Sequence, residues 1–196
     1  MRLGILGGTY DPPHVGHLLA AVDALEALEL DRLVLIPSGQ QPLKVGEVSA
    51  TPAQRLAMVR LLAGDDPRLA VDPIEIERGG LSYTVDTLAE YAERHPAAER
   101  FFLVGADVLA TFDKWREPER VLRLARLVVL RRAVDGGAPA PPVRAPAGAE
   151  PIEVATRRVD VSSTEVRARV RAGKSVRGFV PEAVAAYIAS EGLYRG

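Results

Sequence analysis

Short apolar segments alternate along this chain with segments of helical periodicity, and this alternation restricts its possible folds more than any other feature. The strongest predicted strands are residues 2–6, 32–36, 101–104 and 127–130, with weaker extended pieces at 71–76 and 152–154. Apolar spacing predicts helices over residues 15–30, 52–63, 84–94, 118–125, 163–172 and 181–191. Such alternation is typical of a parallel sheet joined by right-handed crossovers. We therefore predict an α/β, Rossmann-like doubly wound sheet with helices on both faces and a small helical C-terminal part.

The pattern is interrupted once, over residues 133–151, which are rich in Ala, Pro and Gly and poor in apolar side chains. We interpret this segment as an exposed, flexible loop, because too little chain follows it to build a second core. The chain of 196 residues is then expected to form a single domain, residues 1–196.

Composition narrows the classes of function. The chain has no cysteine, which excludes disulfides, thiolate zinc sites, iron–sulfur clusters and cysteine nucleophiles. Its 25 basic and 26 acidic residues give a formal charge of −1, so no electrostatic footprint for nucleic acid or an anionic membrane is present. No apolar run approaches the ~20 residues of a membrane span, and the N-terminus lacks a secretory signal. We expect a cytoplasmic protein without nucleic acid or membrane partners, and a homo-oligomer stays open.

The richest segment for chemistry is Gly7–His17, GGTYDPPHVGH, which lies between the first predicted strand and the first predicted helix. Two of the three histidines of the chain, His14 and His17, are three residues apart here and can share one face of a helix start. The two opening glycines allow close approach of a ligand, and Gly16 keeps bulk away from the histidines. Free N–H groups at the helix N-terminus favour phosphate. A plain turn with surface histidines would explain any one residue but not the whole string.

Other phosphate and metal motifs do not match this segment. It lacks the Gly-Lys-Ser/Thr ending of a P-loop and the three-glycine spacing of a dinucleotide-binding turn. The two histidines could hold a metal, but no third ligand is evident in the sequence. We therefore predict a phosphate site there and no protein metal site.

A second group of polar residues lies at the start of the predicted helix over residues 163–172. Ser162 or Ser163 is a suitable N-cap, and Thr164 and Arg167 follow in the first turns. Hydroxyls and an arginine at a helix start can bind an anion, the arginine through bidentate contacts to phosphate oxygens. Taken alone, the segment would also fit an ordinary capped helix.

Together the two motifs resemble the nucleotidylyltransferase superfamily, whose members carry H-x-G-H after the first strand and an I-S-S-T-x-x-R-like sequence near the end. Within it the chain resembles the bacterial nicotinate-nucleotide adenylyltransferase family over residues 2–193. Supporting segments are SYTVDTL at residues 82–88 and VGAD at residues 104–107, followed by Trp115. Two positions depart from that family's pattern: Tyr10 replaces a common phenylalanine, and Leu43 replaces the usual histidine before Lys44.

The resemblance implies transfer of the adenylyl group of ATP to nicotinate mononucleotide, with Mg²⁺ entering bound to ATP. It implies catalytic roles for His14 and His17, which would donate hydrogen bonds to the phosphates. The ATP site implied by the resemblance comprises Gly7, Gly8, Thr9, His14, Gly16, His17, Gly105, Asp107, Ser162, Ser163, Thr164 and Arg167. The implied mononucleotide site comprises Tyr10, Lys44, Tyr83, Thr84 and Trp115.

Three alternatives remain from the sequence. A phosphopantetheine adenylyltransferase belongs to the same superfamily, but those chains are usually shorter and lack the Ser-Tyr-Thr segment with its tryptophan. A cytidylyltransferase acting on a small alcohol phosphate is disfavoured for the same reason. A nucleotide-binding regulator without chemistry would keep the glycines and Arg167 but would not need both histidines.

Overall fold

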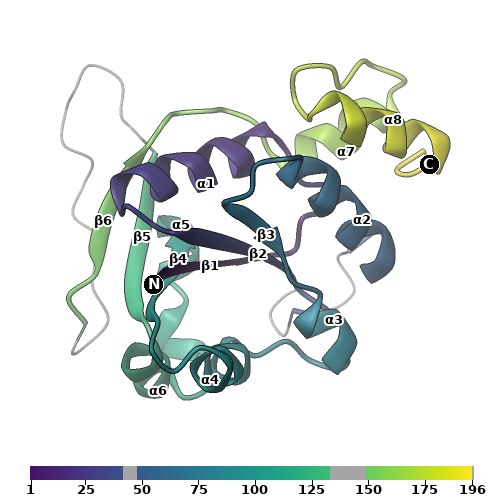
Figure 1. Cartoon of the computed structure of the whole chain (residues 1–196). Coiled ribbons are helices and arrows are strands. Elements are labelled where there is room, and N and C mark those ends of the chain that lie inside the picture. Colours follow the sequence, from purple (N-terminus) through teal and green to yellow (C-terminus); the bar gives the residue numbers. More distant parts are fainter. Residues whose placement is uncertain (42–47, 133–148, 196) are drawn as a thin grey trace.

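The computed structural model describes residues 1–41, 48–132 and 149–195, which fold around one parallel sheet (Figure 1). Its strands are β1 (Arg2–Gly8), β2 (Arg32–Pro37), β3 (Leu69–Val71), β4 (Glu99–Gly105), β5 (Arg126–Arg132) and β6 (Ile152–Thr156). Their order is β3-β2-β1-β4-β5-β6, and all five neighbouring pairs are parallel. The predicted doubly wound sheet is confirmed.

Helices cover both faces of the sheet. On one face lie α1 (Val15–Ala27) and α2 (Pro52–Ala63), joined by the C-terminal pair α7 (Ser163–Arg171) and α8 (Glu182–Ser190). The opposite core takes residues from α3 (Ile74–Arg78), α4 (Thr84–Arg94), α5 (Ala106–Leu109), the 3₁₀ turn η1 (Phe112–Lys114) and α6 (Pro118–Leu124). Figure 1 shows α1 and α2 above the sheet and α3, α4 and α6 below it. The predicted helical C-terminal part is therefore α7 and α8.

The strands serve two cores at once because successive side chains point to opposite faces. In β4, Phe101 and Leu103 pack toward α1, while Phe102 and Val104 pack toward the other helical layer. These strands are buried on both faces, which explains why the sequence shows continuous apolar runs instead of alternation.

Local signals set the start of α2 as predicted. The Thr51 hydroxyl accepts a hydrogen bond from the Gln54 N–H at 3.3 Å, and the Gln54 side chain accepts one from the Thr51 N–H at 3.0 Å. This reciprocal capping box, with Pro52 in the first turn, satisfies donors that a helix start leaves free.

One predicted element is wrong in part. Residues 71–76 were expected to be extended, but the strand ends at Val71 and a short helix begins at Ile74. The Asp72 carboxylate accepts the Ile74 N–H at 2.9 Å, which turns the chain out of the sheet. The short helices between Ala106 and Lys114 were not predicted from the sequence.

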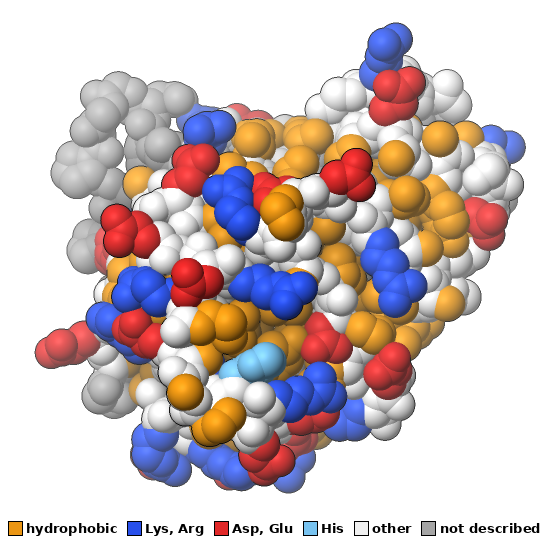
Figure 2. Space-filling view, viewed as in Figure 1, with side chains coloured by type: hydrophobic (Ala, Val, Ile, Leu, Met, Phe, Trp, Pro, Cys, Tyr) orange, Lys and Arg blue, Asp and Glu red, His pale blue; other side chains and the backbone are white. Residues whose placement is uncertain are grey.

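Surface charge is mixed on the face that Figure 2 presents, where acidic and basic side chains are interspersed, in keeping with the formal charge of −1. Among the helices that the structure describes, none combines the length and apolar character that a membrane crossing requires. Most of the predicted 133–151 loop, residues 133–148, lies outside the described residues.

Candidate active site

A cavity of about 750 Å³ opens at the carboxyl ends of the strands. The sheet order changes direction between β1, which leads to β2, and β4, which leads to β5. In open α/β sheets this switch point is where ligands bind. The cavity is lined by residues of β1, β2, β4, β5 and β6 and of the segments that follow β1, β2, β4 and β6.

Most residues predicted for the site meet in this one cavity. Those that line it are Gly7, Gly8, Thr9, Tyr10, His14, Gly16, His17, Tyr83, Thr84, Gly105, Asp107, Trp115 and Ser163. Ser162, Thr164 and Arg167 belong to the adjoining start of α7 and do not line it. Lys44 and Leu43 lie outside the described residues.

The two histidines form a closely packed pair of tilted rings at the beginning of α1. His14 is the N-cap residue, and its backbone N–H donates to Nδ1 of His17 at 3.1 Å. Their ring centroids are 3.8 Å apart. A Cβ on Gly16 would lie 3.0 Å from two atoms of the His14 ring, so glycine is the residue that leaves room for this ring. Because Nδ1 of His17 accepts, a neutral His17 carries its proton on Nε2 and can donate there.

Burial keeps both histidines neutral. Desolvation, reinforced by the charge of Arg132, lowers the pKa of His14 to about 4. The pKa of His17 is well below its ordinary value because of burial, the neighbouring His14 and Arg132. Nδ1 of His14 is buried and has no hydrogen-bond partner among the described residues. The site therefore offers neutral N–H donors near an arginine, which suits a ligand that already carries negative charge.

Tyr10 lies beneath this pair. Its φ of 52° is in the left-handed region, and its hydroxyl donates to the carbonyl of Leu6 at 3.0 Å. The ring stands edge-on to His17 with centroids 5.0 Å apart. A Cβ on Gly8 would approach the Tyr10 ring to 2.9 Å, which explains the second glycine of the motif. Tyr10 is almost fully buried and so supports the ring of His17 from below.

The second motif reaches the first through hydrogen bonds. Ser162 is the N-cap of α7 and accepts the Glu165 N–H at 3.1 Å. The Ser163 hydroxyl donates to the carbonyl of Pro12 at 2.8 Å, across 151 positions in the chain. Arg167 donates to the carbonyl of Asp11 at 2.7 Å. The predicted phosphate role of Arg167 stays a prediction, since here its guanidinium contacts the loop.

The opposite side of the cavity is aromatic and carries the start of α4. Trp115 packs against Phe112 and Phe102, with centroid distances of 5.2 and 5.9 Å, and its indole N–H donates to Thr111. Tyr83 is the N-cap of α4, so the first N–H groups of the helix are near the cavity.

Sequence reasoning missed two buried charges, one on the wall of the cavity and one that hydrogen-bonds its loops. The Arg55 guanidinium, 1% exposed, donates to the carbonyls of Thr9 and Gly39 at 2.8 and 2.9 Å. Its place on the apolar face of the predicted 52–63 helix was a usable signal. The Glu75 carboxylate, 8% exposed, accepts from the Thr87 hydroxyl at 2.7 Å. It gave no such signal, because its segment was predicted to be extended.

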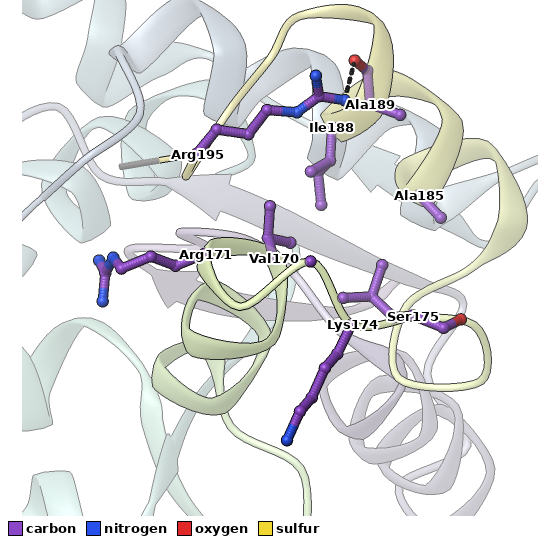
Figure 3. Close-up of a pocket in the computed structure, with 10 residues that line it drawn as sticks. Val170, Arg171, Lys174, Ser175, Ala185, Ile188, Ala189 and Arg195 are labelled. Carbon is purple, nitrogen blue, oxygen red and sulfur yellow. Dashed lines mark hydrogen bonds between the residues drawn. The ribbon is translucent and has the colours of Figure 1, made fainter.

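A second hollow lies between α7 and α8, floored by Val170 and Ile188 (Figure 3). Arg171, Lys174 and Arg195 border it, but Figure 3 shows Arg171 and Lys174 extending away from the space and from each other. No predicted site residue lines this hollow, and its cations do not converge on one ligand position.

Comparison with known proteins identifies relatives of this chain. A family model described as cytidylyltransferase-like matches residues 5–169. A relative from Gemmatimonas aurantiaca, named "probable nicotinate-nucleotide adenylyltransferase", is 53% identical over 100% of this chain and 93% of its own length. A relative with the same name from Thermus thermophilus is 43% identical over the full length of both chains.

Solved structures share the fold. The nicotinic acid mononucleotide adenylyltransferase of Plasmodium falciparum, complexed with NaAD, superposes with a TM-score of 0.77 at 16% identity, covering 98% of this chain and 97% of that one. At this identity the likeness concerns the fold alone, and the sequence relatives are the evidence for family membership.

Proposed function

This chain belongs to the nicotinate-nucleotide adenylyltransferases of the cytidylyltransferase-like family, and on that premise we propose that it transfers the adenylyl group of ATP to nicotinate mononucleotide. The products are deamido-NAD and pyrophosphate. The observation that carries the proposal is the neutral His14–His17 pair at a helix start, placed at the switch point of the sheet.

The reaction needs no nucleophile from the protein. An oxygen of the mononucleotide phosphate forms a bond to the α-phosphorus of ATP, and the bond from that phosphorus to the bridging oxygen breaks. The electron pair leaves with pyrophosphate. Because the attacking phosphate is already anionic, catalysis consists of aligning the two substrates and offsetting charge on the transferring group.

His14 and His17 supply that offset as catalytic residues. Their N–H groups donate to phosphate oxygens and contribute most where negative charge grows in the transition state. Being neutral before substrates arrive, they donate without a proton transfer. Gly7, Gly8, Thr9 and Gly16 allow the phosphates to approach the backbone at the start of α1.

The remaining ATP contacts are divided between two segments. Gly105, the last residue of β4, and Asp107, which follows it, lie in the cavity where the ribose and base would bind. Ser162, Ser163, Thr164 and Arg167 at the start of α7 bind the leaving pyrophosphate, for which Arg167 would exchange its contact with the carbonyl of Asp11 for phosphate oxygens.

Mg²⁺ fits this site as a companion of ATP. Among the described residues, no group of three or more His, Asp or Glu side chains could hold a metal by itself. The cavity does offer the exposed carboxylate of Asp107. One such carboxylate suits an ion that is bound chiefly by phosphate oxygens and water. The ion would reduce the negative charge of the triphosphate.

Nicotinate mononucleotide occupies the aromatic side. Trp115 stacks on the pyridine ring, and the N–H groups near Tyr83 and Thr84 bind its carboxylate. Tyr10 contributes by supporting the ring of His17. Lys44, which lies outside the described residues, is expected to add positive charge on this side.

The experiment is incubation of the purified protein with Mg-ATP, or with Mg-CTP in a parallel series, and one candidate phosphate at a time: nicotinate mononucleotide, nicotinamide mononucleotide, phosphopantetheine or a small alcohol phosphate. Pyrophosphate release is followed, and the product is identified by mass. We expect deamido-NAD from nicotinate mononucleotide. Pyrophosphate only with phosphopantetheine would establish that alternative, CTP-dependent activity would indicate a cytidylyltransferase, and nucleotide binding without pyrophosphate would indicate a regulator.

A further inference from the structure

Glu75 is a buried carboxylate on the wall of the cavity to which the proposed reaction gives no role. It belongs to the short helix α3, and only 8% of the residue is exposed. Burial raises its pKa, while hydrogen bonds from Thr87 and Ser82 and the charges of Arg78 and Arg55 act in the opposite direction. A negative group next to the site of an anionic substrate opposes binding electrostatically, so any contribution of Glu75 to binding comes through structure.

The two hydroxyls that contact Glu75 are each bound on both sides. Thr87 donates to Oε1 of Glu75 at 2.7 Å and accepts from the Arg78 guanidinium at 2.8 Å. Its other acceptor, the carbonyl of Tyr83, is at 3.5 Å. A hydroxyl has one proton, so the Thr87 proton is directed at Glu75.

The Ser82 hydroxyl repeats this arrangement. It hydrogen-bonds the Glu75 carboxylate and accepts the Gly39 N–H at 2.9 Å. A Cβ on Gly39 would lie 2.7 Å from the backbone oxygen of Glu75, so the turn after β2 lies directly against α3. Through Glu75, three separate segments are held together: α3, this turn and residues 82–87.

The same network reaches the phosphate side. Arg55 donates to the carbonyl of Gly39 with one nitrogen and to the carbonyl of Thr9 with the other. The network also approaches Trp115. Its neighbour in the sequence, Arg116, places its guanidinium 4.9 Å from the centre of the ring of Tyr83, the N-cap residue of α4. Glu75 is thus the acceptor at the centre of the contacts that hold the start of α4 in place.

We propose that Glu75 is a positioning residue for the mononucleotide: by accepting the hydroxyl protons of Ser82 and Thr87, it holds the N–H groups at the start of α4 at the spacing from Trp115 that the substrate carboxylate and ring require. This inference rests on the proposed function. It identifies Glu75 as the residue that positions the donors by which the site selects a mononucleotide with a carboxylate. Glu75 itself does not touch the reacting atoms.

The test is Glu75→Gln, read through Trp115, the only tryptophan of the chain. The amide keeps one acceptor but offers an NH₂ to a hydroxyl that needs an acceptor. We expect the Kd for nicotinate mononucleotide, from quenching of tryptophan fluorescence, and its KM to rise about tenfold, the size of one hydrogen bond to a charged group. The KM for ATP should stay within about twofold.

Electrostatics alone predicts the opposite sign, because removing a negative charge beside the site should tighten binding of an anion. A lower Kd in Glu75→Gln would therefore overturn the proposal, as would equal changes for both substrates. The matched control is Glu77→Gln, an exposed carboxylate on the same helix, which should leave both constants unchanged.

Thr87→Val provides an independent route if Glu75→Gln does not fold. It removes the donor and keeps the side-chain shape, so it should raise the same Kd and spare ATP. If both single variants fold, the double variant Glu75→Gln/Thr87→Val should bind the mononucleotide no more weakly than the weaker-binding single variant. The reason is that both substitutions remove the same hydrogen bond. Additive losses would contradict a shared role.

Failure of the proposed function is distinguishable. If the wild-type protein neither binds nor adenylylates nicotinate mononucleotide, the function is wrong, and the same variants are then measured with the phosphate that it does accept. If the wild type uses nicotinate mononucleotide and Glu75→Gln binds it equally well, only the role of Glu75 is wrong.

Discussion

The hydroxyl of Tyr194 donates a 2.8 Å hydrogen bond to Oδ1 of Asp11, 183 positions earlier in the chain. Asp11 is 4% exposed and also accepts the backbone N–H groups of Ser49 and Ala50 at 2.8 and 3.0 Å. Its carbonyl accepts Arg167. Asp11 therefore joins the end of the chain, the segment before α2 and α7 to the loop that carries His14.

Tyr194→Phe should lower the free energy of unfolding by roughly 1–3 kcal/mol, because a buried carboxylate oxygen loses one of its donors. Urea unfolding at neutral pH measures this. Tyr187→Phe on α8, a partly buried tyrosine, serves as the control and should change stability by less than about 0.5 kcal/mol. Equal losses in both variants would contradict the role of the Asp11 contact.

His17→Ala should reduce turnover by roughly 10²-fold or more, the cost of losing one preorganised donor to a developing charge. Affinity for ATP should change much less, since the ring acts mainly in the transition state. Steady-state kinetics with both substrates varied provides the measurement. His95→Ala, which removes the histidine at the end of α4, is the matched control and should keep wild-type turnover. Near wild-type turnover in His17→Ala would refute the catalytic role.

Stability should fall as the pH falls below about 6.5. In this range the unfolded chain binds protons at His14 and His17. In the folded protein the pKa of His14 is about 4 and that of His17 is well below its ordinary value, so both stay neutral to lower pH. The unfolded state then binds more protons, so acid favours unfolding. The part due to His14 is on the order of 3 kcal/mol between pH 6.5 and 4.

Chemical denaturation at a series of pH values tests this slope. His14→Gln should make it less steep, because one of the two histidines responsible is gone, while His95→Ala should not. An unchanged slope in His14→Gln would show that other groups govern acid sensitivity.

Arg167→Ala should weaken ATP binding and lower turnover, while the KM for the mononucleotide stays nearly constant. Arg167 lies near the start of α7 and contacts the Gly7–His17 loop at the carbonyl of Asp11, away from Tyr83 and Trp115. Arg167→Lys should recover part of the loss, because lysine keeps the positive charge but cannot make the two parallel hydrogen bonds of a guanidinium. Equal losses toward both substrates would contradict the separation of the two sides.

Nicotinate mononucleotide should be preferred over nicotinamide mononucleotide by about tenfold to several hundredfold in kcat/KM. N–H donors near Tyr83 satisfy a carboxylate, whereas the amide places an NH₂ against one of them, which costs about 1–3 kcal/mol. Trp115→Ala should weaken both substrates and largely preserve their ratio, since stacking holds either ring. Equal kcat/KM values would refute the assignment of the carboxylate site.

Local patterns were enough for the framework and for the first motif. The strands and most helices follow from runs and spacings of apolar residues. The pairing of His14 with His17 follows from their separation by three positions at one helix start. The segment 71–76 shows the limit of this reasoning: its apolar content fits a strand, yet the Asp72 side chain accepts the Ile74 N–H and the chain turns into a helix there. A hydrogen bond between near neighbours prevailed over β propensity.

What the sequence by itself determined is the doubly wound sheet, the place of the Gly7–His17 loop on it and the residue types at the helix starts. Only the tertiary structure decided which distant groups meet: Ser163 with Pro12, Tyr194 with Asp11, and Glu75 with Thr87. The physical reason is that the spacing of residues along the chain encodes local conformation. The partner of a buried charge is set by how whole elements pack, and in a parallel sheet these elements come from distant parts of the chain.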